Sequence, residues 1–411
     1  MAESNFRISV RLLCTRRFGT FWFASLLANI GTWAQQVAQP WLLLTLGASS
    51  FLVGLDAFAL GAPVLLLTLV GGVLADRADR RRIIAVFQSI QMLCPVMLVV
   101  LLLAGILQPW EVIVISLVVG ITDALSMPSF QTIVPSIVER RQLSAGLALN
   151  SMQFNLSRIL GPSLAGVLMA SVGAIACFAV SAASYAPFIF VALWILPHGR
   201  IARPAGEKAG ARHPFAGIRA ITRHPDLRGA LLTVVVASLF CGPLITFIPV
   251  LVKDVFHGDV RHYSLAAAAF GGGGLLGAAA LLFVDASQDL RRWNTWFARG
   301  FGVVLVAAAL NPWLWAVPVL TMLAGATMTL SNTLANSHLQ FSAPAHFRGQ
   351  TISLFMLAMR GGLALGSLLT GLSASLVGVR YALLINGLLA VLAQAVIGWQ
   401  WLRLVPQKTP T

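Results

Sequence analysis

The sequence is poor in charged residues, above all in acidic ones. Only 10% of its 411 residues are charged, with 13 Asp and Glu against 28 Lys and Arg. Soluble domains carry about 25% charged residues, and a soluble core of this length would not bury 58% hydrophobic residues, because surface area does not shrink fast enough with size. The composition excludes an ordinary soluble protein and indicates that lipid surrounds most of the chain.

Cysteine and histidine are too few and too scattered to indicate a reactive centre. The four cysteines form no Cys-x-x-Cys pair, and all seven histidines except His338 lie in loops or at the edges of apolar segments. Such cysteines are typical of small buried hydrophobic residues. We therefore expect no metal, no cofactor and no enzymatic activity, and a membrane-embedded enzyme stays a remote alternative.

Features that bind phosphate are also lacking. The run Gly271–Gly274 lies inside an apolar segment and has no Lys-Ser/Thr after it, so we expect no nucleotide. The net charge of +15 comes from short loops rather than from a basic domain, so we expect no nucleic acid. Residues 1–17 are polar and basic and precede a full-length apolar run, which predicts an uncleaved anchor rather than a signal peptide.

What the sequence has instead is twelve long apolar runs. A transmembrane helix needs about 20 mostly apolar residues, and this length predicts an all-α integral membrane protein of two six-helix halves. The N-terminal half covers residues 1–197, a cytoplasmic linker covers 198–228, and the C-terminal half covers 229–411. The predicted spans are 20–46, 51–75, 83–107, 110–135, 147–172, 174–196, 229–252, 262–284, 294–311, 314–340, 350–376 and 379–402.

The basic residues predict the orientation. If the N-terminus is inside, 23 of the 28 Lys and Arg lie at cytoplasmic ends, and only Lys253, Arg261 and Arg380 lie outside. Arg158 and Arg360 fall within spans. Because positive residues stay on the cytoplasmic side, we expect both termini to be cytoplasmic.

The two predicted halves also resemble each other. Three glycines of the fifth span recur in the eleventh span at a constant offset of 205 residues. Together with the central linker, this favours two parallel repeats that rock around a site at the middle of the membrane. The pairs are Gly161 with Gly366, Gly166 with Gly371, and Gly173 with Gly378.

The loop after the second span carries the most specific motif. Residues 71–82 read GGVLADRADRRR, which resembles the cytoplasmic loop signature of the major facilitator superfamily, G-x-L-x-D-R-x-G-R-R, with Asp79 where the pattern prefers glycine. Glycine lets helices approach closely, and a carboxylate here is suited to cap a helix N-terminus. A cluster that only sets topology is the alternative. We expect a conformational switch formed by Gly72, Asp76, Arg77, Arg80 and Arg81.

A second motif, Gly161-Pro162 followed by Gly166, resembles the exporter motif of the same superfamily, although Ala165 replaces one expected glycine. Proline bends a helix and glycine permits close packing, here expected between the halves. A simple packing kink is the alternative.

Along its whole length the chain is similar to the branch that contains the enterobactin (siderophore) exporter and related drug efflux proteins. The resemblance implies a monomeric secondary transporter that exports an amphipathic small molecule across the bacterial inner membrane by alternating access. Proton antiport is expected, although no arginine occurs between Trp110 and Val138, where many proton antiporters carry one. An importer or facilitator on the same fold is the alternative. The matching stretches are 71–77, 120–124 and 347–350.

Ionisable residues inside spans are expensive and are functional candidates. Asp123, in the middle of the fourth span, is a candidate proton carrier, or else the permanent partner of Arg158 in the fifth. Asp56, near the outer end of the second span, is a further coupling candidate, with water or an interfacial partner as the alternative.

Polar residues at helical spacing predict a substrate cavity. Amides also join helices to each other, and aromatic residues also pack, so both alternatives stay open. Arg360 is expected either to meet an anionic substrate or to bond main-chain carbonyls. The cavity candidates are Asn29, Trp33, Gln36, Asn332, Asn336, Arg360, Phe240 and Phe355.

Overall fold

The computed structural model describes residues 5–77, 79–131, 133–195, 224–281, 289–343 and 348–404. Among these residues there is no strand, and each predicted span coincides with one helix or with consecutive helical segments. Ten of the helical stretches are long and apolar enough to cross a membrane. The other two long helices are α2 (Arg16–Thr45) and α7 (Leu143–Ser171), which carry more polar side chains. The predicted all-α membrane fold is confirmed.

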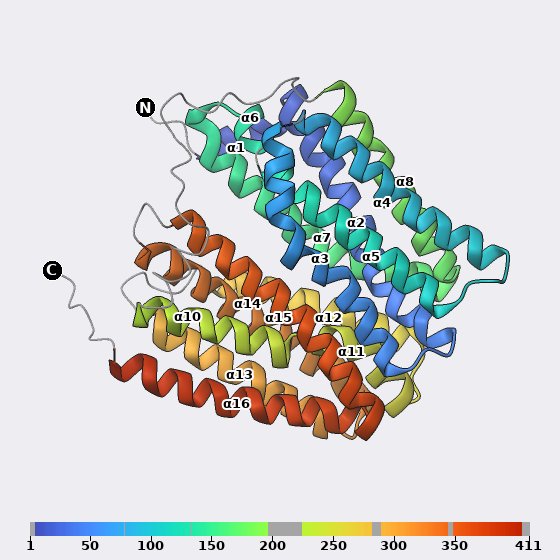
Figure 1. Ribbon diagram of the computed structural model, residues 1–411, viewed down its shortest axis with the longest axis vertical. Helices are drawn as coiled ribbons and strands as arrows, with labels where there is room; N and C mark the ends of the chain where they lie inside the picture. The colour runs from blue at the N-terminus through green and yellow to red at the C-terminus, as the bar shows by residue number, and fades with distance from the viewer. Residues whose placement is uncertain are drawn as a thin grey trace. The chain divides into compact units, whose positions relative to one another are not determined.

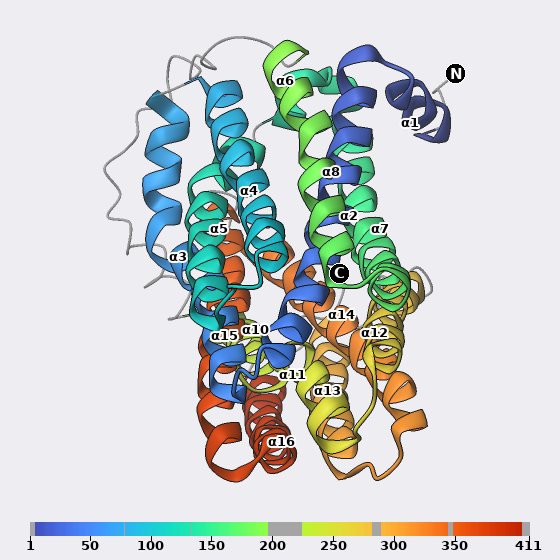
Figure 2. The same cartoon turned by 90° about the vertical axis from the view of Figure 1, so that its right-hand side faces the viewer.

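The first compact unit contains Met1–Ala48 and Ala62–Ala205. Helix α2 packs along α7 and α8 (Ala174–Trp194), and α4 (Arg80–Leu103) packs against α8 and α5 (Pro109–Gln131) (Figures 1 and 2). Rings of Phe21 and Phe130 lie 5.8 and 5.5 Å from that of Phe188, in an apolar core near one end of these helices. The short elements are α1 (Asn5–Leu13), α6 (Ile133–Ile137) and η1 (Arg140–Gln142).

The second compact unit contains Ser49–Gly61 and Gly206–Thr411. Helix α12 (Val260–Ala280) packs along α14 (Val317–Ser342), and α13 (Leu290–Leu310) packs against α14 and α16 (Val379–Leu404) (Figure 2). The unit also holds α15 (Arg348–Val377) and the short η5 (Leu314–Ala316). Helix α3 (Ser50–Arg77) is divided, because its residues as far as Gly61 group with this unit and the rest with the first.

The seventh predicted span is a chain of helical segments rather than one regular helix. It consists of α10 (Pro225–Val236), a π-helical turn η2 (Ala237–Cys241), α11 (Leu244–Val250) and a second π-helical turn η3 (Leu251–Val255). Gly242 N donates to Ala237 O at 2.9 Å, five residues back, where Gly242-Pro243 interrupts the regular pattern. Helix α10 starts at Pro225, so the last four residues of the predicted linker are helical. The halves 1–197 and 229–411 stay a prediction.

Candidate functional site

Helix α2 presents two polar faces in the first unit. On one face the amides of Gln35 and Gln39 are buried and bonded: Ser181 donates to Gln35 Oε1 at 2.9 Å, and Gln39 donates to Ser116. On the other face lie the predicted cavity residues, of which Gln36 is exposed. The helix-joining amides of Gln35 and Gln39 therefore lie on a different side of α2 from the exposed amide of Gln36.

The other two cavity candidates on α2 contact α7. Asn29 donates to Gln153 Oε1 at 3.3 Å, so this amide joins the helices, as the alternative use predicted. Trp33 lies beneath the Arg158 guanidinium, 5.5 Å from its ring centroid, a geometry suited to a cation–π contact. Gly161 makes this approach possible, because a Cβ there would overlap Trp33 Cβ and lie 3.1 Å from Ala34 N.

The exporter motif thus has a visible local role. Gly161 and Pro162 are buried in α7, and Gly166 is half-buried. The close packing that Gly161 permits is with α2 of the same unit. A role of the motif in export itself stays a prediction.

Asp123 lies on α5 beside two buried glutamines of α4. Gln88 donates to Gln91 at 2.8 Å, and Gln91 donates to Asp123 Oδ1 at 3.5 Å. Asp123 also interacts electrostatically with Tyr185 of α8, whose hydroxyl lies 2.9 Å from Thr32 Oγ1.

The structure does not bring Asp123 and Arg158 together as an ion pair among the residues it describes. Arg158 contacts Trp33, while Asp123 contacts Gln91. The second predicted carboxylate, Asp56, is buried, with 6% of its surface exposed, and groups with the second unit.

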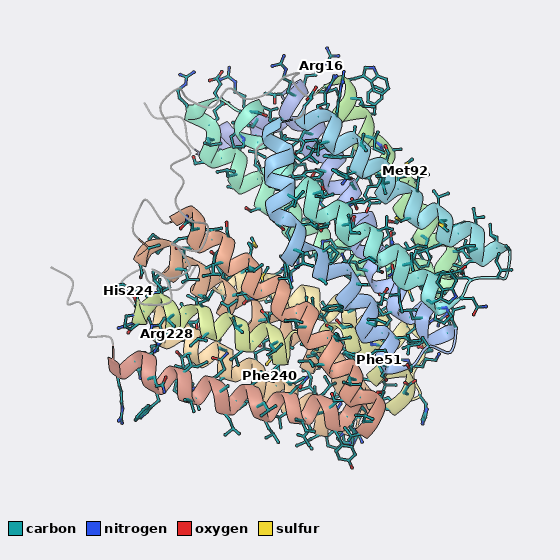
Figure 3. The ribbon with its side chains drawn as sticks, in the orientation of Figure 1. Arg16, Phe51, Met92, His224, Arg228 and Phe240 are labelled. Atoms are coloured by element: carbon teal, nitrogen blue, oxygen red, sulfur yellow. The ribbon has the colours of Figure 1, made fainter. Side chains whose placement is uncertain are left out.

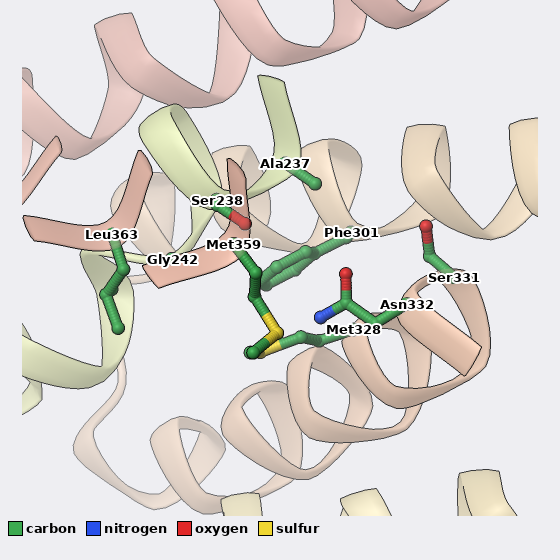
Figure 4. Close-up of a pocket in the computed structure, with 9 residues that line it drawn as sticks. All are labelled: Ala237, Ser238, Gly242, Phe301, Met328, Ser331, Asn332, Met359 and Leu363. Carbon is green, nitrogen blue, oxygen red and sulfur yellow. The ribbon is translucent and has the colours of Figure 1, made fainter. Parts of the chain in front are cut away.

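In the second unit, Asn332 lines a small cavity of about 20 Å³ (Figure 4). This volume suffices for roughly one water molecule. Asn332 Oδ1 is buried and has no hydrogen-bond partner among the residues that the structure describes, which is costly for an amide. Thioether and aromatic groups of Met328, Met359 and Phe301 complete the wall, with Ser238 from the π-helical turn η2.

The remaining candidates of this unit have different surroundings. Asn336 accepts from Gln340 at 3.1 Å within α14. Arg360 is half-buried on α15. Phe240, which is labelled in Figure 3, is half-buried on η2. Phe355 is 4% exposed inside an apolar cluster with Leu339 and Trp401, so its position supports the packing alternative rather than a ligand contact.

A carboxylate of the loop motif caps a helix, and it is Asp79, the residue that departs from the pattern. Asp79 accepts from Arg81 N at 3.1 Å as the N-cap of α4, and Arg81 donates in turn to Leu193 O of α8. The aspartate at position 79, where the pattern prefers glycine, therefore has a structural role as a helix cap. Gly72 lies within α3. The side chains of the other switch candidates lie outside the described part of the chain: Asp76, Arg77 and Arg80.

Three polar features were not assigned to their residues from the sequence. The pair Gln88 and Gln91 follows the helical spacing i, i+3, which was a usable signal. The cap at Asp79 has the residue type of an N-cap. An ion pair between Asp226 and His338 (3.0 Å) joins residues 112 positions apart, which no local pattern reveals.

Comparison with known proteins adds to this geometry. A family profile described as "Transmembrane secretion effector" matches residues 11–408. The staphyloferrin A transporter of Staphylococcus aureus (strain NCTC 8325 / PS 47) is 26% identical over 363 residues, covering 87% of this chain and 90% of that protein. The multidrug efflux pump Tap of Mycolicibacterium fortuitum is 26% identical over 385 residues, covering 90% and 93%. The crystal structure of the nucleoside transporter NupG has the same fold, with a TM-score of 0.73 at 14% identity, over 94% of this chain and 99% of that one.

Proposed function

Because the chain belongs to the transmembrane secretion effectors of the major facilitator superfamily, a family of multi-pass membrane transporters, we propose that it exports an amphipathic small molecule across the bacterial inner membrane by alternating access. The observation that carries the proposal is the family match over residues 11–408. The small cavity beside Asn332 has room for about one water molecule; it contributes the character of its wall, a buried amide oxygen among thioether and aromatic groups, and not a space that already fits a substrate. Such a wall suits a ligand that is both apolar and rich in hydrogen-bonding groups. The similar proteins that transport staphyloferrin A and multiple drugs support this class of substrate.

We propose that export is driven by proton antiport through Asp123. The alternative, a permanent bridge to Arg158, has no support in the contact that Arg158 makes with Trp33. A carboxylate beside the neutral amides of Gln91 and Gln88 loses its charge on binding a proton, which lowers the cost of its place inside a span. Substrate release and proton uptake then take place on the outer side, and proton release and substrate binding on the cytoplasmic side.

Flux measurements in proteoliposomes test this proposal. The wild-type protein is expected to move a siderophore-type chelator or a multidrug dye against its gradient when protons flow in the opposite direction. The Asp123→Asn variant should keep exchange of substrate at equal pH but lose the response to the pH gradient. Asp254→Asn, at an exposed carboxylate of η3, is the matched control and should behave as wild type.

Three results would contradict the proposal. Antiport fails if wild-type flux ignores the pH gradient, and the role of Asp123 fails if its variant responds like wild type. Substrate accumulation in cells that express the chain, compared with cells that lack it, would replace export with import.

A further inference from the structure

A second group of ionisable side chains lies at one end of the second unit, apart from Asp123. Asp226 in the first turn of α10 accepts from Trp401 Nε1 of α16 at 2.8 Å, and His338 Nε2 of α14 lies 3.0 Å from its other oxygen. The His338 and Trp401 rings meet edge to face at 5.3 Å. One carboxylate thus joins three helices.

The side chains of this cluster are largely buried. The Asp226 and His338 side chains are 13% and 12% exposed, and Trp401 is 3% exposed. Gly229 leaves room for the indole ring of Trp401, because a Cβ at this position would overlap it. Apolar residues of α10 and α14, such as Leu227 and Leu339, cover the cluster.

A neighbouring pair sets the charge of the cluster. Asp289, the N-cap of α13, lies 3.0 Å from Arg291 Nε, and Arg291 is 7% exposed. Arg291 interacts electrostatically with Asp226, and Asp289 does so with His338. Two carboxylates and one guanidinium give a net charge of −1, which a proton on His338 brings to zero.

The other described charges on these helices do not change this balance. His224, Arg228, Arg292 and Arg403 are exposed, and Arg299 donates to carbonyls of α16. On α15, Arg360 lies 12 residues beyond the helix start, and the side chain of Arg348 is outside the described part. On α12, which runs parallel to α14, the charges Arg261 and His262 lie in the first turn, at the other end.

We propose that His338 and Asp226 form a second proton-binding site. When His338 carries its proton, the site holds together the start of α10 and the C-terminal ends of α14 and α16. A hydrogen bond between charged groups is about twice as strong as a hydrogen bond between neutral groups. Losing the proton leaves the buried cluster with an uncompensated negative charge, so the three ends are held less firmly. Histidine changes charge within the physiological pH range, so transport becomes sensitive to pH on this side, where both termini are expected.

Unfolding of the purified full chain in detergent tests the site without any transport. We expect the wild-type Tm to fall as pH rises from 6 to 8, because a neutral His338 no longer forms an ion pair with Asp226 in the folded chain. His338→Gln should remove most of this fall. His262→Gln is the matched control, since His262 pairs with Asp259 at 2.6 Å on the exposed surface, and it should keep the wild-type pH dependence.

A second measurement compares the wild-type protein with a variant of the partner carboxylate. Exchange of the ring Cε1 hydrogen of His338, followed by mass spectrometry from pH 5 to 9, should depend on pH differently in Asp226→Asn and in the wild-type protein. An exchange profile that is the same in both, or a Tm profile in His338→Gln like that of wild type, would overturn the proposal.

Proteoliposome flux provides the functional readout, which rests on the proposed export. At a constant pH difference, the wild-type rate should change several-fold as both sides move from pH 6 to 8, and His338→Gln should flatten this profile. The two sites are distinguished if Asp123→Asn loses the response of flux to the pH gradient but keeps the wild-type dependence of flux on absolute pH. A His338→Gln profile equal to wild type would refute the effect on transport.

Discussion

Two adjacent glycines of α12 are expected to respond to alanine in opposite directions. Gly273 faces the backbone of α14, where an added Cβ would overlap the Met322 carbonyl and lie 2.9 Å from Met322 Cα. Gly272 has nothing within 4 Å of the same added atom. Because α12 and α14 pack along each other, Gly273→Ala must push two backbones apart.

The magnitudes follow from these surroundings. Overpacking costs about 1–3 kcal/mol, while alanine in a helix interior gains about 0.5–1 kcal/mol over glycine. For a unit of 150–250 residues, the size range of the second unit taken alone, 1 kcal/mol moves Tm by roughly 2–4 °C. Gly273→Ala should therefore lower the Tm of this unit by several degrees, and Gly272→Ala should raise it by about 1–4 °C. Thermal unfolding of the purified protein in detergent measures both. Changes of the same sign in the two variants would refute the packing argument.

Three further predictions concern polar residues. Asn332→Leu should raise Tm, because it removes a buried oxygen without a partner at a cost of about 1–3 kcal/mol, and should lower substrate flux; unchanged flux would exclude Asn332 from the cavity wall. Asp79→Ala should destabilise the protein by about 0.5–2 kcal/mol through loss of the cap on α4, measured by denaturant unfolding, and a neutral variant would contradict the cap. Partial burial raises the pKa of Asp289, but its bonds to Arg291 outweigh this and hold that pKa below its usual value. Its stabilising effect is therefore present above about pH 4 and is lost as pH falls further, so Asp289→Asn should show a smaller loss of Tm between pH 5 and 3 than wild type.

The helices were predictable because a bilayer imposes a length on every span. All twelve predicted ranges coincide with helical segments, including α2 and α7, which are not among the ten stretches long and apolar enough to cross a membrane by composition alone. The boundary at Pro225 was missed because the polar residues Asp226 and Arg228 read as linker, although they form the first turn of α10. The helix α1 was missed for a related reason, since its basic residues interrupt any apolar run.

The candidate site was less predictable, because residue type does not determine which neighbour a side chain reaches. Asn29 and Gln36 lie on the same stripe, yet one amide bonds Gln153 and the other is exposed. Phe355 has the composition of a ligand contact but lies in an apolar cluster. Such differences depend on the rotation of each helix against partners more than 100 residues away, and spacing along one helix carries no information about it.

The polar character of α2 has a consequence for how the chain is made. This helix is the first of the long ones to leave the ribosome, yet Asn29 and Gln35 find Gln153 and Ser181 only 124 and 146 residues later. At synthesis rates of about 5–20 residues per second, these amides wait roughly 6–30 s for their partners. During that interval α2 must be sheltered by the insertion machinery or by water at its edge, so the first unit is expected to enter the bilayer as an assembled group rather than helix by helix.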